Sequence, residues 1–183
     1  MTDIQRRIYL VSQDLFAARG YAGVSIADIA ERAKIAKSTV LHHYANKQKL
    51  YEQVVAESIE FFSRMPGADA QAVPLADRLK FLLTQMVAEP MHAKLLNRVF
   101  MDNPKSAGVA ARRYWRPLLK QLAGDENPAA EATAMFCVNA IIQIAFSVEL
   151  QREILGRCSA EEIAARYGQV IDQLAGITQS TVG

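Results

Sequence analysis

Apolar residues recur at helical spacing along most of the chain. Near the N-terminus they fall at Ile4, Ile8, Val11 and Leu15, and the run stops at Gly20. This is the pattern of one helical face followed by a residue that favours the end of a helix. The same spacing predicts later helices over residues 75–89, 90–102, 105–123, 128–155 and 160–177. No β-rich alternating run lies between turn clusters, so the sequence predicts an all-α protein.

Two short helices are predicted before the next long one. Ser25 precedes "IADIAERA" and Asp28 stands three residues later, which predicts a capping box at the start of the first. The second should run from Lys37 to Tyr44, and Asn46 should cap the long helix after it. A helix, a three-residue turn and a short helix within residues 26–44 have the dimensions of a helix-turn-helix.

The second short helix has an apolar side and a polar side. Val40 and Tyr44 lie four residues apart and face inward. The outer face then carries hydrogen-bond donors, namely Lys37, Ser38, Thr39 and His42. Such side chains can meet base edges in the major groove or phosphate oxygens beside it.

Charge is distributed unevenly. The net charge is only +2, but residues 1–53 hold eight basic and five acidic side chains. Between Glu31 and Glu52 the cations meet no acid, and they are Arg32, Lys34, Lys37, Lys47 and Lys49. By itself such a block is either a solvated face or a site for an anionic partner. Beside a helix-turn-helix it predicts binding to double-stranded DNA.

The segment "LFAARGYAGVSIADIAERAKIAKSTVLHHYANKQKLYEQVV" resembles the TetR family of transcriptional regulators over residues 4–54. Four elements stand in family order: Phe-x-x-x-Gly-Tyr, Ser-Ile-x-Asp-Ile-Ala, Lys-Ser-Thr and Asn-Lys-x-x-Leu. The resemblance implies a three-helix DNA-binding domain over 1–54. It also implies a helical domain over 55–183 that forms a homodimer and holds a small-molecule inducer of unknown identity.

The resemblance also implies roles for single residues. Ser25 and Lys47 would contact phosphate. Base or backbone contacts would come from Lys37, Ser38, Thr39, His42 and His43. Three positions depart from the expected pattern. Leu41 stands where the family commonly has a tyrosine and would give an apolar contact to a thymine methyl. Ala36 lacks the usual capping hydroxyl, and Lys34 replaces a glycine, so either Lys34 is left-handed or the turn differs.

Candidate ligand contacts lie on the later helices. They are Met86, Phe100, Trp115, Phe136, Asn139 and Gln143. For the apolar members, ordinary core packing is the alternative. Asn139 and Gln143 share one face of an apolar helix and need partners if buried: a ligand, a dimer contact, or a backbone or water bond. Arg112, Arg113 and Arg116 around Trp115 form either an acidic-ligand site or an exposed basic face.

The last two helices are the predicted dimer interface. The helix from Ala129 to Leu155 carries more apolar residues than one face can bury within its own subunit. The following helix offers a second stripe, consisting of Ile163, Tyr167, Val170, Ile171 and Leu174. A dimer would read the two halves of a palindromic operator.

The sequence gives little indication of a metalloprotein, a membrane protein or an enzyme. Cys137 and Cys158 are expected as buried thiols in a cytoplasmic protein. His42, His43 and the single Glu89-x-x-His92 do not make a metal site, and no cofactor or membrane span is expected. The prediction is a repressor released by a small molecule. The alternative is a helical small-molecule- or lipid-binding protein or enzyme whose N-terminal helices do not bind DNA.

Overall fold

The computed structural model describes residues 1–63, 73–102, 112, 115–123 and 128–180. These residues form helices and no strand, which confirms the all-α prediction. The helices are α1 Asp3–Arg19, α2 Ile26–Arg32, α3 Lys37–His43, α4 Lys47–Ser63, α5 Leu75–Ala88, α6 Pro90–Asp102, α8 Arg116–Ala123, α9 Pro128–Phe146, α10 Val148–Ile154 and α11 Ala160–Ser180.

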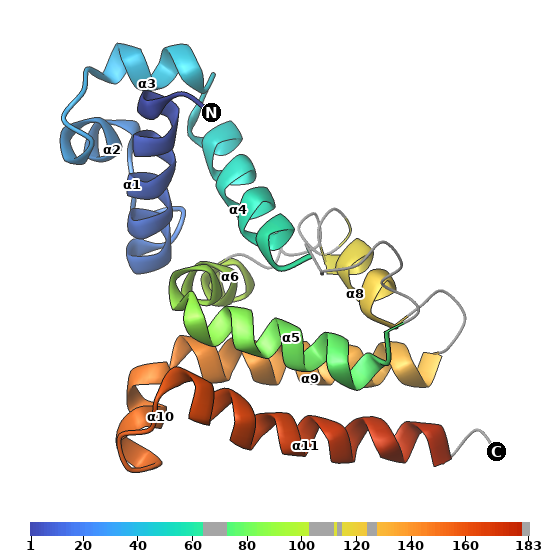
Figure 1. The fold of residues 1–183 in the computed structure, drawn as a ribbon. Helices are drawn as coiled ribbons and strands as arrows, with labels where there is room; N and C mark the ends of the chain where they lie inside the picture. Colours follow the sequence, from blue (N-terminus) through green and yellow to red (C-terminus); the bar gives the residue numbers. More distant parts are fainter. Residues whose placement is uncertain (64–72, 103–111, 113–114, 124–127, 181–183) are drawn as a thin grey trace.

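The helices form two lobes (Figure 1). In the upper lobe, α2 and α3 lie beside α1 and the first turns of α4. In the lower lobe, α5, α6, α9 and α11 pack together. The predicted end of α1 is confirmed, because Gly20 has a φ of 70° and its N–H bonds to the Phe16 carbonyl. Asn46 also acts as predicted, since its Oδ1 accepts a hydrogen bond from the Lys49 N–H at 2.9 Å.

Two predicted helices differ from the observed ones. The helix expected over 128–155 is divided at Ser147 into α9 and α10. There the Ser147 hydroxyl donates to the Gln143 carbonyl at 2.7 Å, a side-chain bond that competes with the helical ladder. Of the helix expected over 105–123, the structure describes α8 with Pro117 in its first turn, and residues 105–111 lie outside the described part. Helix α4 continues through residue 54, where the two domains were predicted to divide.

Helix α9 is long and apolar enough to cross a membrane by length and composition alone. Core helices of soluble proteins have the same length and composition, so these two properties alone do not indicate a membrane span. One side of α9 is buried among the other helices, through Ala134, Cys137, Val138, Ile141 and Ile142. The thiol of Cys158 is buried as well, so both predicted buried cysteines are confirmed.

A polar bridge joins the upper lobe to the lower one. Gln13 on α1 is 5% exposed, and its Nε2 lies 2.9 Å from Nδ1 of His92 on α6. The same amide donates to Ser58 Oγ on α4 at 3.4 Å, and Ser58 in turn donates to the Val54 carbonyl. The ring of Phe61 stacks on His92 with centroids 4.7 Å apart. Three helices from both lobes therefore meet at one amide.

This bridge should make stability depend on pH. Burial lowers the pKa of His92, and the smaller effect of Glu89 opposes that shift. His92 in the unfolded chain, with a pKa of about 6.5, therefore binds a proton more readily than His92 in the folded protein. The free energy of unfolding should then fall as the pH drops from about 6.5 towards the lower pKa of the folded state. Urea unfolding between neutral and mildly acid pH measures this. A His92→Asn variant, which keeps an acceptor but does not titrate, should lose that part of the pH dependence; an unchanged pH profile would contradict the assignment.

Candidate nucleic-acid interface

The helix-turn-helix begins at a capping box on α2. The Ser25 Oγ accepts a hydrogen bond from the Asp28 N–H at 3.1 Å, and the Ser25 N–H donates to Asp28 Oδ2 at 2.6 Å. Hydrogen bonding from the Ser25 side chain, followed by that from the Ser25 N–H, holds the pKa of the Asp28 carboxyl below its ordinary value. The predicted capping box is confirmed. Ser25 remains exposed.

The turn between α2 and α3 takes the left-handed form. Lys34 has a φ of 53°, so it adopts the conformation that a glycine would adopt more easily. The strain for a side-chain-bearing residue is about 1–2 kcal/mol. Helix α3 then starts after Ala36 without a side-chain cap, as expected from the missing hydroxyl.

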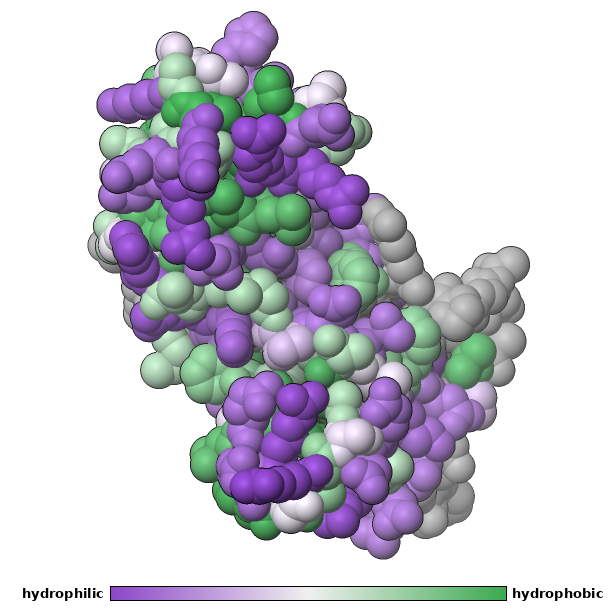
Figure 2. Space-filling model, turned by 60° about the vertical axis from the view of Figure 1, so that its left-hand side comes forward, coloured by the Kyte–Doolittle hydropathy of each residue, from purple (hydrophilic) through white to green (hydrophobic). Residues whose placement is uncertain are grey.

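Helix α3 has the two faces that the sequence predicts. Val40 is fully buried and Tyr44 is 6% exposed, so these two side chains anchor the helix in the core. Thr39 and His43 are half-buried. The exposed side chains are Lys37, Ser38, Leu41 and His42. In Figure 2 hydrophilic side chains cover much of the upper lobe, with hydrophobic ones between them.

Lys47 has an internal role that the sequence did not indicate. Its Nζ donates to the carbonyls of Tyr21 and Val24 at 2.9 and 3.0 Å, and lies 4.0 Å from the centre of the Tyr21 ring. The ammonium group thus ties the loop between α1 and α2 to the start of α4. One of its three protons is left for a further acceptor. A phosphate contact from Lys47 stays a prediction.

The basic block is partly neutralised in three dimensions. Arg32 pairs with Asp14 of α1 at 2.6 Å, and Lys49 pairs with Glu52 at 3.1 Å. No acid lies between these cations in the sequence, but residues outside the block supply carboxylates to Arg32 and Lys49 in the folded chain. Lys34 and Lys37 form no ion pair with any residue in the described part of the chain. The uncompensated charge lies at the turn and at the start of α3.

The candidate ligand residues differ in burial. Met86 is fully buried and Trp115 is 3% exposed, while Phe136 is 64% exposed on α9. The side chain of Phe100 lies outside the described residues. A ligand role for any of them stays a prediction.

Asn139 and Gln143 are exposed on α9 of the single chain, so burial within one subunit does not force either amide to find a partner. Gln143 Nε2 donates to Asn97 Oδ1 at 2.7 Å. Helix α9 is apolar nearly all round, so its sequence does not tell which side faces the core. A dimer contact, one of the three partners considered for these amides, is compatible with their position.

An apolar stripe is exposed along α9 and α10. Phe136, Leu150 and Ile154 are each about 60% exposed or more. The apolar stripe consists of Met135, Phe136, Phe146, Leu150 and Ile154. The stripe predicted on α11 is used differently: Ile163 and Ile171 are buried within the subunit, and of its five members only Val170 is exposed. Most of the predicted α11 stripe therefore belongs to the core of one subunit.

Cations of the lower lobe divide into exposed and buried ones. Arg112 and Arg116 are exposed, which fits the basic-face interpretation, and Arg113 lies outside the described residues. Arg78, on α5, is a buried cation with 6% of its surface exposed. No pattern in the sequence marks Arg78, because its position on α5 becomes buried only when α8 packs over that helix.

In the described part of the chain no group of three His, Cys, Asp or Glu side chains is arranged to hold a metal.

A helix-turn-helix with a buried inner side and an exposed donor face defines the class of DNA-binding transcriptional regulators. Residues 8–54 match the model of the bacterial regulatory proteins of the tetR family. The chain belongs to the TetR family of helix-turn-helix transcriptional regulators.

Full-length relatives agree with that assignment. The chain is 22% identical to the HTH-type transcriptional repressor KstR2 of Mycolicibacterium smegmatis over 91% of its own length and 86% of that protein. Among solved structures, Salmonella enterica GusR has a TM-score of 0.69 at 18% identity, covering 96% of this chain and 98% of that one. A TetR-like transcriptional regulator from Rhodococcus sp. RHA1 has a TM-score of 0.65 at 19% identity, covering 97% and 96%. These two share the fold with this chain.

Proposed function

We propose that this regulator is a cytoplasmic, non-enzymatic repressor that binds a palindromic operator as a homodimer and leaves it when a small molecule binds. The observation that carries the proposal is the exposed donor face of α3, held outward by the buried Val40 and Tyr44. A helix presented in this way fits the major groove. The naming of the M. smegmatis relative as a repressor supports the sign of regulation.

Each exposed residue of α3 receives a specific role. Lys37 and Ser38 contact phosphates or base edges near the start of the helix, and His42 contacts a base edge one turn later. Leu41 is 40% exposed and packs on a thymine methyl. Thr39 and His43 are half-buried, so they contact the DNA from the margin of the exposed face of α3. Ser25 and the remaining proton of Lys47 contact phosphates of the DNA backbone, and these contacts fix the orientation of the protein on the duplex.

The dimer forms through the two C-terminal segments, α9–α10 and α11. The apolar stripe supports this, because an exposed run of large apolar side chains is covered in solution by another surface. A two-fold axis through this face gives two copies of α3, and each reads one half-site. Half-sites about 34–36 Å apart, or a multiple of that distance, are then required.

Release from the operator follows from a change in the separation of the two copies of α3. A ligand that prefers a separation unsuited to the operator weakens DNA binding by its differential affinity for the two states. The Gln13–His92 bridge supports coupling between the lower lobe and the DNA-binding helices. Because the bridge connects α6 to α1 and α4, a movement of α6 would displace both of these helices. Met86 and Trp115 are the buried candidates for contact with that ligand.

Selection of bound DNA from a random pool tests the proposal. The expected result is a palindrome bound by a dimer, with an affinity that falls steeply as salt increases, because phosphate contacts release counterions. A single asymmetric site would contradict the homodimeric mode. Absent or salt-insensitive DNA binding would favour the alternative, a helical carrier or enzyme whose N-terminal helices only pack.

A further inference from the structure

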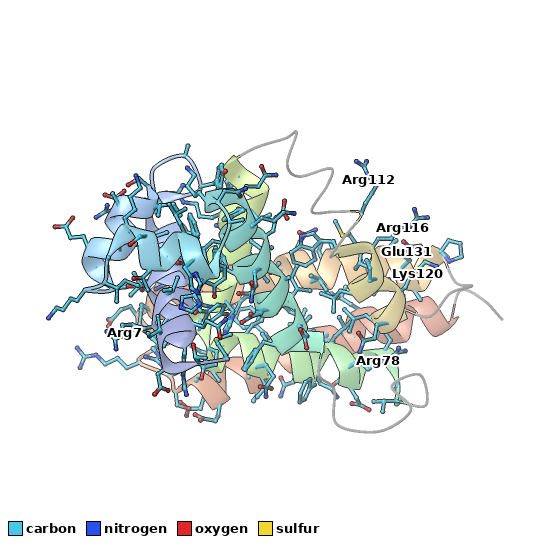
Figure 3. All side chains as sticks on the ribbon, turned by 90° about the horizontal axis from the view of Figure 1, so that it is seen from above. Arg7, Arg78, Arg112, Arg116, Lys120 and Glu131 are labelled. Carbon is cyan, nitrogen blue, oxygen red and sulfur yellow. The ribbon has the colours of Figure 1, made fainter. Side chains whose placement is uncertain are left out.

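Arg78 is a buried cation that reaches from α5 to α8. Its side chain is 6% exposed, and Nη1 donates to the Gln121 carbonyl at 2.8 Å. Gln121 lies near the C-terminal end of α8, where carbonyls carry partial negative charge. Figure 3 shows Arg78 apart from Arg112, which precedes the other end of α8. One edge of the guanidinium is therefore used by a helix end.

The other edge of the guanidinium is not used. Nε of Arg78 is buried and has no hydrogen-bond partner. Nη2 makes no hydrogen bond to any residue that the structure describes, and no described carboxylate pairs with this arginine. Burial lowers the pKa of Arg78, with no nearby charge contributing. Because arginine stays protonated in proteins, a full positive charge lies inside the lower lobe, and among the described residues its partner is a single carbonyl.

Buried leucines lie near Arg78 in the sequence of α5 and on the helix that it joins, α8. On α5, Leu79 and Leu82 are fully or almost fully buried, and Leu118 and Leu122 are buried on the facing helix α8. An uncompensated charge in such surroundings is unfavourable unless an anion accompanies it. Arg116 on α8 differs, because its side chain is exposed (Figure 3).

We propose that Arg78 binds the carboxylate of a small organic acid with an apolar body. The Nε and Nη2 edge is planar and offers two parallel N–H groups, which match the two oxygens of a carboxylate. One negative charge balances one guanidinium, whereas a phosphate dianion would leave an excess charge among leucines. The inference rests on the proposed function, in which a small molecule enters the lower lobe, and it supplies the chemical class of that molecule.

Thermal unfolding of the full-length protein tests the site. The probes are hexanoate, decanoate and phenylacetate, each compared with the primary alcohol of the same carbon skeleton, and inorganic phosphate. At least one carboxylate should raise the Tm by about 2–4 °C or more, since a ligand that binds only the folded state stabilises it. The matched alcohols and phosphate should give no comparable shift.

Two variants locate the effect. Arg78→Met should abolish the carboxylate shift and leave the Tm without ligand unchanged or higher, because it removes a buried charge that has no counter-charge. Arg116→Met, which removes an exposed arginine of the same lobe, should keep the shift. Arg78→Lys keeps the charge but not the fork and should give a smaller shift.

Three results would overturn the inference. They are the absence of any carboxylate shift in the wild type, a shift that survives in Arg78→Met, and a ligand-free Tm that falls by several degrees in Arg78→Met. The third would show that Arg78 serves only to join α5 to α8. Operator binding measured on the same preparations separates this inference from the proposed function: DNA binding without a carboxylate shift removes only the ligand class, and a shift without DNA binding removes the repressor.

Discussion

Phe136→Asp should convert the regulator from a dimer into a monomer that binds its operator poorly. Phe136 is 64% exposed near the start of the apolar stripe, and the proposed two-fold axis places this stripe against its own copy. The substitution removes a large apolar contact and introduces a carboxylate on both sides of the interface. We expect the dimer dissociation constant to rise at least about 100-fold, which corresponds to roughly 3 kcal/mol. Analytical ultracentrifugation measures the change.

A matched variant on another helix controls for the added charge. Met101 on α6 is 73% exposed and lies outside the apolar stripe, so Met101→Asp should remain a dimer. Operator affinity should fall only in Phe136→Asp, because two linked copies of α3 bind two half-sites far more tightly than separate ones. Dissociation of both variants to the same extent, or of neither, would place the interface elsewhere.

Lys37→Ala and Lys47→Ala should separate DNA recognition from folding. Lys37 is exposed and forms no ion pair with a described residue, so its loss should leave stability unchanged. Operator affinity should fall by about 1–3 kcal/mol per subunit, and the salt slope should decrease by about 2 for the dimer. Lys47→Ala should in addition lower the free energy of unfolding by about 2 kcal/mol, since two carbonyls lose a charged donor.

Lys49→Ala is the control for these lysine variants. Lys49 is an exposed lysine in the same part of α4, and Glu52 already compensates its charge. Its replacement should change neither stability nor operator affinity by more than about 0.5 kcal/mol. Fluorescence anisotropy with the selected operator and urea unfolding give both quantities. If Lys37→Ala behaves like Lys49→Ala, the start of α3 does not contact DNA.

The parts of the fold that depend on local sequence were predictable. The capping box of Ser25 and Asp28 is formed by residues three apart, and the inward side of α3 follows from the four-residue spacing of Val40 and Tyr44. Lys34 was ambiguous only between two turn conformations, and its φ of 53° decides between them.

Features that depend on contacts between distant helices were not predictable. Nothing near Lys47 in the sequence indicates that the carbonyls of Tyr21 and Val24 would take two of its protons. Helix α9 has apolar residues on nearly every side, so periodicity could not tell its core side from the side that carries Phe136 and Asn139. Arg78 is one arginine on an amphipathic helix until the packing of α8 buries it.

The bridge at Gln13 limits how this regulator can be recombined with others. Its N-terminal unit cannot be exchanged as a cassette ending at residue 54, because α4 continues to Ser63 and contributes Ser58 to the bridge. A chimera would have to transfer Gln13 and Ser58 together, and the recipient would have to offer an acceptor where His92 stands on α6. Without it, the buried Gln13 amide would lose one of its two partners, and the grafted N-terminal unit would lose this contact with α6.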